Sequence, residues 1–271
     1  MDVCSDGPIG LLDSGLGGLT VLQSARELLP AEDFVFYGDL AHSPYGGRSK
    51  EEVVSIIEKS VSELQVRRIK ALVLASNTGT SAAAEHLRER LEIPVVGMEP
   101  ALKPAVRAVG KGKILVLATE LTLRERKFEA LWRQYRHEAP IILKSCPGLV
   151  ELIDHGVHSG PKLDAFLADL LREARAEPVS VVVLGCTHYI IVREAILQVF
   201  SPKPLCLDGN DGVARQLCNV LDQRGLLRAA GTRGTVQIIS SDPTRLGLLE
   251  ETFQRLDTVR GGRPIPRKPR Q

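Results

Sequence analysis

The sequence predicts an α/β protein with parallel sheets and a ligand site at the carboxyl ends of the strands. Short apolar runs recur along the chain, small polar residues follow several of them, and helical periodicity comes next. This alternation is typical of parallel sheets that carry helices on both faces. Ligands of such sheets bind beyond the carboxyl ends of the strands, where the polar residues lie.

The predicted elements follow one another along the chain. The apolar runs predict strands at Ile9–Leu12, Phe34–Tyr37, Ala71–Ala75, Val95–Gly97, Ile114–Ala118, Ile141–Leu143, Val181–Leu184, Leu205–Leu207 and Val236–Ser240. The periodic segments predict helices over about Gly18–Leu29, over about Ser49–Arg67, from after Thr78 to about Arg90, and from after His188 to about Val199.

Two segments share one pattern. LVLASNTGTSAAAEHLRERL and VVVLGCTHYIIVREAILQVF each run from an apolar strand through Ser76 or Cys186 and two polar residues into an amphipathic helix. Because every α/β protein repeats strand–loop–helix units, the similarity of the two segments can arise from the fold class alone. The alternative is a pair of pseudo-symmetric lobes that each present one reactive residue to a shared cleft. The chain would then cross between the lobes near Pro94 and Ser201–Pro204.

Length and charge limit the possible functions. At 271 residues the chain can form two modest lobes or one large domain. The net charge of +2 argues against a nucleic-acid partner, and the basic tail from Arg260 to Arg270 is expected to be a solvated chain end. No run approaches the roughly 20 apolar residues of a membrane span, so no membrane partner is expected.

The cysteines and the N-terminus indicate the compartment. No basic stretch followed by an apolar one begins the chain, so no secretory signal is expected. The five cysteines are scattered, odd in number and without a CxxC pair, which predicts a cytoplasmic protein with reduced thiols. Because Cys146, His155 and His158 match no zinc spacing, no metal is expected.

Asp13-Ser14-Gly15-Leu16-Gly17-Gly18 leads from a predicted strand into a predicted helix. Its glycines would leave backbone N–H groups available to an anion such as a carboxylate. A dinucleotide site would need a third glycine at another offset, and an aspartic protease would need a second Asp-Ser-Gly in β-rich lobes. A carboxylate in this place suits the orientation of a base or an interaction with an ammonium group.

Two further segments place reactive side chains after strands. Gly185-Cys186-Thr187-His188 sets a thiol at the start of a predicted helix and near a histidine, surroundings that favour the thiolate form of a cysteine. A buried structural cysteine is the alternative. Ser76-Asn77-Thr78-Gly79-Thr80 could cap its helix or bind the polar ends of a small amino acid.

Six segments together resemble one family. IGLLDSGLGGLTVL, FYGDLAHSPYGGRS, LVLASNTGTS, VLATELTLRERKF, CPGLVELIDHG and VLGCTHY are similar in order and spacing to motifs of the cofactor-independent glutamate racemases, in the aspartate/glutamate racemase superfamily. The resemblance implies two pseudo-symmetric α/β lobes with mostly parallel sheets, the active site in the cleft between them, and a homodimer. It divides the chain into residues 1–96 plus about 208–271, and residues 97–207.

The resemblance also implies a reaction. The family interconverts L- and D-glutamate without pyridoxal phosphate or any other cofactor, and the D-enantiomer enters peptidoglycan. One cysteine on each side of the glutamate removes or returns the α-proton.

Matched position by position, the resemblance assigns roles to residues. Cys186 matches the second catalytic cysteine, which acts on the L-enantiomer, and His188 matches the histidine that assists it. Asp13 matches the aspartate that assists the first thiol, and Asp154 lies where many members carry a glutamate near the site. The expected substrate-binding residues are Ser14, Pro44, Tyr45, Gly46, Asn77, Thr78, Thr119, Thr122 and Thr187.

The sequence departs from the family at a reacting position. Where the family has Ala-Cys-Asn-Thr this chain has Ala-Ser-Asn-Thr, so Ser76 takes the place of the first catalytic cysteine. Because a serine hydroxyl is a far weaker acid than a thiol, we expect a protein that binds glutamate and racemises it slowly or not at all. Three histories fit: a substitution introduced to hold substrate, a one-thiol relative similar to the arylmalonate decarboxylases, or a binding protein without turnover.

Overall fold

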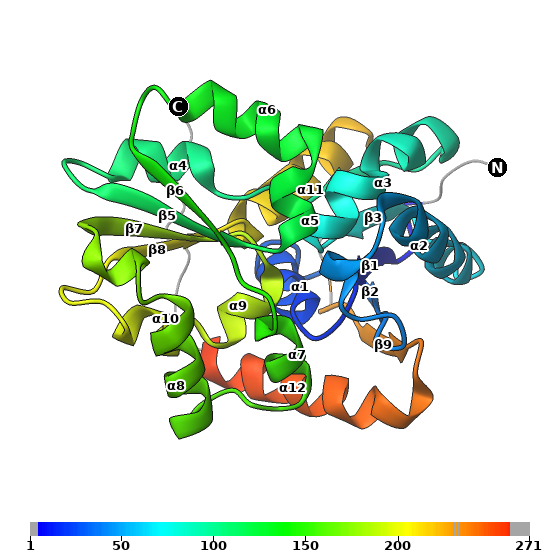
Figure 1. Cartoon of the computed structure of the whole chain (residues 1–271). Coiled ribbons are helices and arrows are strands. Elements are labelled where there is room, and N and C mark those ends of the chain that lie inside the picture. Colours follow the sequence, from blue (N-terminus) through cyan, green and yellow to red (C-terminus); the bar gives the residue numbers. More distant parts are fainter. Residues whose placement is uncertain (1–4, 230, 232, 261–271) are drawn as a thin grey trace.

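Two separate parallel sheets form the frame of the protein (Figure 1). The computed structural model describes residues 5–229, 231 and 233–260, so Cys4 and the basic tail beyond Arg260 lie outside the described residues. Every strand pairing in the described part of the chain is parallel. The predicted fold class, two α/β lobes with parallel sheets, is confirmed.

The first sheet has five strands and contains both the first and the last strand of the described chain. Its central strand β1 pairs with β2 and β3, and the C-terminal strand β9 joins the edge beside β2. In spatial order the strands are β4 (Val95–Gly97), β3 (Ala71–Leu74), β1 (Ile9–Asp13), β2 (Phe34–Gly38) and β9 (Val236–Ser240).

The second sheet has four strands and comes from the middle of the chain. In spatial order they are β6 (Ile141–Ser145), β5 (Lys113–Ala118), β7 (Val179–Leu184) and β8 (Leu205–Asp208). The residue boundaries predicted for the two lobes stay a prediction.

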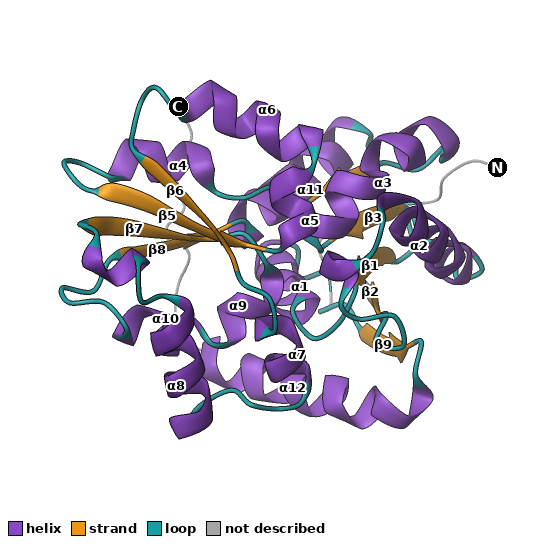
Figure 2. Cartoon of the chain, in the orientation of Figure 1, coloured by secondary structure: helices purple, strands orange, loops and turns teal. Residues whose placement is uncertain are grey.

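Helices pack on both faces of the first sheet, because successive strand residues point to opposite sides (Figure 2). Ile9 and Leu11 of β1 belong to one apolar cluster, and Leu12 belongs to another. One face carries α1 (Gly18–Leu28), α11 (Asn210–Gln223) and α12 (Leu246–Arg260), and the other carries α2 (Lys50–Gln65) and α3 (Asn77–Arg90). We call this sheet with these helices the first lobe.

The second sheet is covered in the same way, and with its helices we call it the second lobe. Val182 and Leu184 of β7 face one cluster, whereas Val181 and Val183 face the other. The helices are α4 (Leu102–Ala108), α6 (Arg126–Tyr135), α7 (Leu149–Asp154), α8 (Pro161–Leu170), α9 (Thr187–Ile191) and α10 (Arg193–Gln198). The short elements are α5 (Glu120–Arg124) and the 3-10 turns η1 (Tyr45–Gly47), η2 (Ala174–Ala176) and η3 (Pro243–Arg245).

The predicted strands are all present, but one predicted helix is wrong. The segment after His188 forms two short helices, α9 and α10, separated at Val192. Val192 has φ −109° and ψ 21°, outside the helical region. The β-branched run Ile190–Val192 favours the break, because these side chains lose rotamer freedom in a helix.

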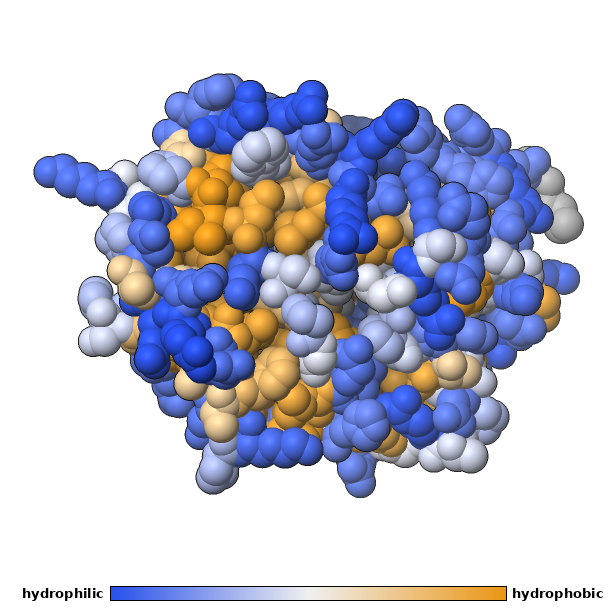
Figure 3. All heavy atoms as spheres, in the orientation of Figure 1, coloured by the Kyte–Doolittle hydropathy of each residue, from blue (hydrophilic) through white to orange (hydrophobic). Residues whose placement is uncertain are grey.

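The surface differs between the lobes. On the face shown in Figure 3, hydrophilic side chains cover α2 and α6, whereas hydrophobic side chains gather over the second sheet. Leu143 on edge strand β6 and Leu205 on edge strand β8 are 36% and 49% exposed. No helix within the described ranges is long and apolar enough to cross a membrane.

Candidate active site

Asp13 and Ser76 lie at the carboxyl ends of neighbouring strands of the first sheet. The N–H of Ala75 donates to the carbonyl oxygen of Leu12 over 2.8 Å, which fixes the two strand ends side by side. Ser76 Oγ accepts a hydrogen bond of 3.2 Å from Gly79 N, so Ser76 caps α3. Among the described residues, no hydrogen bond joins Ser76 to Asp13.

Cys186 begins a line of three polar side chains in the second lobe. Its Sγ lies 3.9 Å from Nδ1 of His188, and Nε2 of His188 lies 3.2 Å from Oδ1 of Asp154. The second contact is a close ion pair whose atoms are not aligned as a hydrogen bond. All three residues are buried. A thiol, an imidazole and a carboxylate in this order form the arrangement that activates a sulfur nucleophile or base.

The charges of this line depend on one another. Burial, the largest single influence, would lower the pKa of His188, but the Asp154 carboxylate and Cys186 together outweigh burial and hold that pKa well above its usual value. Burial would likewise raise the pKa of Asp154, yet His188, the Ser43 hydroxyl and the charge of Arg245 together lower it. His188 and Asp154 therefore form a charged pair near neutral pH.

Hydroxyl groups join the two lobes at the site. Thr187 Oγ1 in the second lobe donates to Asp13 Oδ2 in the first over 3.2 Å. Thr78 Oγ1 lies 2.9 Å from Thr119 Oγ1 and 3.1 Å from Thr122 Oγ1, and these last two are 2.9 Å apart. The carboxyl ends of both sheets thus meet at one place.

The loop that carries Pro44, Tyr45 and Gly46 also reaches this place. Tyr45 Oη donates to Asp39 Oδ2 over 2.7 Å, and burial followed by the charge of Asp39 raises the pKa of Tyr45 well above its usual value. A Cβ on Gly46 would lie 2.7 Å from Cβ of Thr119, so the loop contacts the second lobe directly. Pro44 is half-buried beside them.

Gly17 allows the closest approach between the lobes. A Cβ there would lie 2.4 Å from the backbone N of His188 and 2.6 Å from the carbonyl carbon of Thr187. Since these atoms belong to the backbone, they cannot move aside without shifting α9. The small residue is therefore needed for the contact and not for an unusual backbone angle.

Gly17→Ala is expected to destabilise the fold by about 1–3 kcal/mol, the usual cost of forcing an extra carbon into a packed site. Urea unfolding provides the measurement. The matched control is Gly212→Ala in α11, where nothing lies within 4 Å and alanine should stabilise the helix by about 0.5–1 kcal/mol. Equal behaviour of the two variants would contradict the close contact.

Besides Asp154 Oδ1, which faces His188, two buried oxygen atoms at the site have no aligned hydrogen bond within the described part of the chain. They are Asp13 Oδ1 and Asn77 Oδ1. Ser14 is buried on the same loop as Asp13. The pKa of Asp13 is raised from 3.8 to about 6, chiefly by burial, although His188 and the N–H groups of Ser14 and Gly18 act in the opposite direction. Unpartnered buried acceptors suit a ligand that brings N–H donors.

Asp13→Asn is expected to remove a pH dependence of the stability. Because the folded state holds the Asp13 proton more tightly than the unfolded state does, Asp13 stabilises the fold below about pH 4, and this contribution is lost as the pH rises through about 6. The change of about two units corresponds to on the order of 3 kcal/mol. Between about pH 4 and about pH 7, the unaltered chain should lose more free energy of unfolding than Asp13→Asn. Equal losses would contradict the raised pKa.

Comparison with known proteins identifies the family to which the chain belongs. The pattern of the Asp/Glu/Hydantoin racemase family matches residues 19–217. The chain belongs to the Asp/Glu/hydantoin racemase family. A curated relative, the glutamate racemase of Clostridium acetobutylicum, is 42% identical over 235 residues, which are 86% of this chain and 91% of that protein.

Solved racemase structures share the fold. The glutamate racemase of Escherichia coli, in complex with L-glutamate and the activator UDP-MurNAc-ala, has a TM-score of 0.79 and 30% identity, covering 92% of this chain and 95% of that chain. The glutamate racemase of Francisella tularensis, in complex with D-glutamate, has a TM-score of 0.79 and 25% identity, covering 93% and 94%. The match therefore extends through both lobes of this family member.

Three residues that shape the site are not among those predicted from the sequence. Asp39 holds Tyr45, Ser43 donates to Asp154, and Arg245 donates to the backbone of Asp154. Ser43 could be suspected because it precedes the expected loop Pro44-Tyr45-Gly46. Arg245 could not, because it meets Asp154 across 91 residues of chain. Within the described residues, no cluster of three or more His, Cys, Asp or Glu side chains is arranged to hold a metal ion; the expectation that no cofactor is needed stays a prediction.

Proposed function

We propose that the protein binds glutamate between its lobes and transfers the α-proton without a cofactor, as a glutamate racemase in which one of the two acid/base positions is changed. The observation that carries this proposal is the buried line Cys186–His188–Asp154. A cofactor-free enzyme needs a strong, positioned base in a site from which water is excluded. The names of the relatives support glutamate as the substrate.

In this proposal Cys186 is the base for L-glutamate. Its thiolate takes the α-proton, and the resulting thiol returns a proton to the same carbanion. His188 assists by keeping positive charge beside the sulfur, and Asp154 supports His188. Asp13 would assist the group at position 76 on the other face.

The remaining site residues would hold the glutamate. The ammonium group can donate to the unpartnered oxygens of Asp13 and Asn77. The carboxylates need donors, which hydroxyl and backbone N–H groups supply. The proposed substrate-binding residues are Ser14, Pro44, Tyr45, Gly46, Asn77, Thr78, Thr119, Thr122 and Thr187.

Ser76 is the reason to expect weak inversion. Its hydroxyl accepts from Gly79 N, and it has no hydrogen bond to a base among the described residues that could take its proton. Inversion needs a group on each face of the substrate, so one effective thiol allows exchange on one face only. We propose that the chain racemises glutamate slowly or not at all.

The single thiol also supports a second candidate class. A one-thiol relative similar to the arylmalonate decarboxylases would release carbon dioxide from a substituted malonate and protonate one face of the carbanion. A substrate-binding protein would bind glutamate and turn over neither compound.

Calorimetric titration with D- and L-glutamate, followed by polarimetric assay of the same samples, tests the proposal. We expect saturable binding of both enantiomers with inversion far below that of the Ser76→Cys protein. Carbon dioxide release from a substituted malonate, without glutamate binding, would favour the decarboxylase. Absence of glutamate binding at millimolar concentration would contradict the proposal.

The biological setting follows from this reaction. Any D-glutamate that the enzyme forms would be used for peptidoglycan synthesis, and the proposed compartment of the enzyme is the cytoplasm, where its thiols stay reduced. We also propose a homodimer, because apolar side chains gather over the second sheet (Figure 3). Light scattering tests this assembly, and a monomer at micromolar concentration would contradict it.

A further inference from the structure

Asp154 belongs to the second lobe, but the first lobe holds it in place. Its Oδ2 accepts a hydrogen bond of 2.6 Å from Ser43 Oγ, and its backbone oxygen accepts one of 2.8 Å from Arg245 Nη2. Ser43 lies on the loop between β2 and α2, and Arg245 ends η3 after β9. Both donors therefore come from segments attached to the first sheet.

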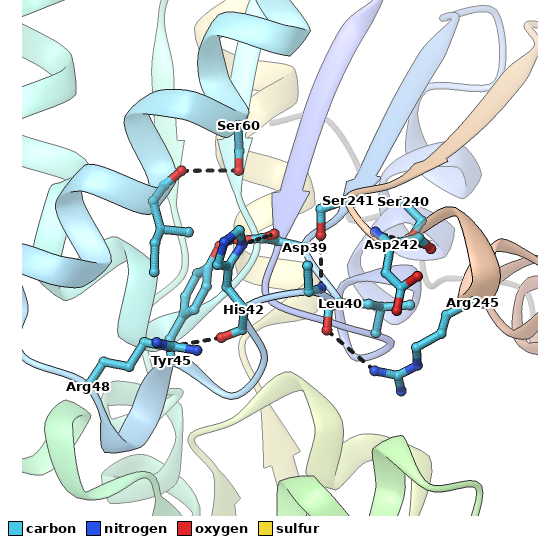
Figure 4. A network of polar contacts seen from close by, with 12 residues as sticks. Asp39, Leu40, His42, Tyr45, Arg48, Ser60, Ser240, Ser241, Asp242 and Arg245 are labelled. Atoms are coloured by element: carbon cyan, nitrogen blue, oxygen red, sulfur yellow. Dashed lines mark hydrogen bonds and ion pairs between the residues drawn. The ribbon is translucent and has the colours of Figure 1, made fainter.

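The two donor segments are tied to each other (Figure 4). Ala41 N donates to Ser241 Oγ over 2.9 Å, and Arg245 Nη1 donates to the backbone oxygen of Leu40 over 3.4 Å. Asp39, which is fully buried, anchors the loop by accepting from Tyr45. The loop and the η3 turn thus form one connected unit.

The Ser43 bond determines which oxygen of Asp154 faces His188. Because Oδ2 is taken by the hydroxyl, Oδ1 is the atom that lies 3.2 Å from His188 Nε2. His188 is 1% exposed and Asp154 is 7% exposed, so water competes little for this pair. In such surroundings an ion pair stabilises the charged imidazole only when its geometry is kept.

We propose that Ser43 and Arg245 are positioning residues that hold Asp154 against His188, so that the Cys186–His188 pair is completed only when the two lobes are in contact. The inference rests on the proposed function, in which His188 serves Cys186. In this proposal, the contact between the lobes that encloses the substrate also places Asp154 beside His188, which assists Cys186 as the base. Loss of the Ser43 contact would free the Asp154 carboxylate to turn away, and loss of the Arg245 contact would release the backbone that carries it. Both changes leave Cys186 and His188 in the chain.

A third contact, between Arg255 and His158, also connects the C-terminal part of the first lobe to the region around Asp154. Arg255 of α12 lies 2.8 Å from Nδ1 of His158, whose Nε2 lies 3.0 Å from the backbone oxygen of Ile153. Burial followed by the charge of Arg255 lowers the pKa of His158, which fits a neutral ring that accepts from the arginine. The C-terminal segment therefore contacts Asp154 directly through Arg245, and it is connected to the neighbouring Ile153 through His158.

Histidine NMR titration of the substrate-free protein tests the proposal. The variants are Ser43→Ala, Ser43→Thr, Arg245→Gln and Asp154→Asn, with Arg133→Gln at a surface ion pair as the control. Ser43→Ala should lower the titration midpoint of His188 by roughly half a unit or more, and Asp154→Asn should lower it further. Arg245→Gln should lower it less than Ser43→Ala does, because it also removes a positive charge beside the pair. Ser43→Thr keeps the hydroxyl and should restore the midpoint of the unaltered chain, and Arg133→Gln should not change it. Among the described residues, the charged or titratable groups that act on His188 include Asp13, Asp154, His158 and Cys186, and Arg245 acts on its partner Asp154.

The outcomes separate the possibilities. An unchanged His188 midpoint in Ser43→Ala would overturn the proposal, and so would an unchanged midpoint in Asp154→Asn. Should Arg245→Gln not fold, the Ser43→Ala and Ser43→Thr pair alone decides the question. A purely structural role would lower the unfolding temperature without moving the midpoint. Because no turnover is measured, a negative racemase assay does not alter this result.

Discussion

Replacing Ser76 with cysteine is expected to raise the rate of glutamate inversion by about 10²–10⁴-fold, the usual contribution of a positioned acid/base group. The new sulfur would lie at the N-terminus of α3, a helix of 14 residues, where backbone N–H groups favour the thiolate. Cys186 would then face a second base of its own kind across the substrate. Polarimetry from either enantiomer provides the measurement.

Ser76→Ala is the matched control for this gain. It removes the hydroxyl that caps α3 and should cost about 1 kcal/mol of stability, but it supplies no base and should not raise inversion. A Ser76→Cys protein that binds glutamate yet inverts it no faster than the unaltered chain would show that Ser76 is not the missing base.

Removing the remaining thiol has the second large effect. Cys186→Ala is expected to reduce exchange of the α-proton of L-glutamate by about 10²–10⁴-fold, because no other described thiol is placed beside a charged imidazole. The measurement is proton NMR of L-glutamate in deuterated water. Binding of glutamate should persist, since Cys186 is not among the proposed substrate-holding residues.

Cys206→Ala is the control for this loss. Cys206 is also buried in the second lobe, but burial raises its pKa to about 11, so its thiol is not ionised near neutral pH. Its replacement should leave exchange unchanged. If exchange survived in Cys186→Ala and disappeared in Cys206→Ala, the assignment of Cys186 as the base would be wrong.

The parallel sheets could be predicted because the relevant signals are local. The apolar runs at Ile9 and Val181 each fill a buried strand, and each predicted strand is present. The prediction of one continuous helix after His188 was wrong, because the apolar periodicity of the sequence continues through Val192 although the helix is interrupted there. Periodicity describes which face is apolar, and it does not report such a local break.

The local parts of the site could also be predicted from the sequence, whereas the contacts between the lobes could not. Cys186 and His188 are two residues apart at the start of one predicted helix, so the sequence predicts that they lie near each other, and the structure places Sγ 3.9 Å from Nδ1. The capping of α3 by Ser76 was one of two interpretations left open, and the structure contains that cap. The donation from Ser43 to Asp154 joins residues 111 apart and depends on how the lobes meet. No spacing rule contains that information.

Deuterated water gives the most direct test of the central claim that this family member has one effective base. The unaltered chain is incubated with L- or D-glutamate, and α-proton loss is followed by NMR while configuration is followed by polarimetry. We predict deuterium incorporation into L-glutamate with retention of configuration, and little incorporation into D-glutamate. Fast incorporation with inversion from both enantiomers would contradict the claim.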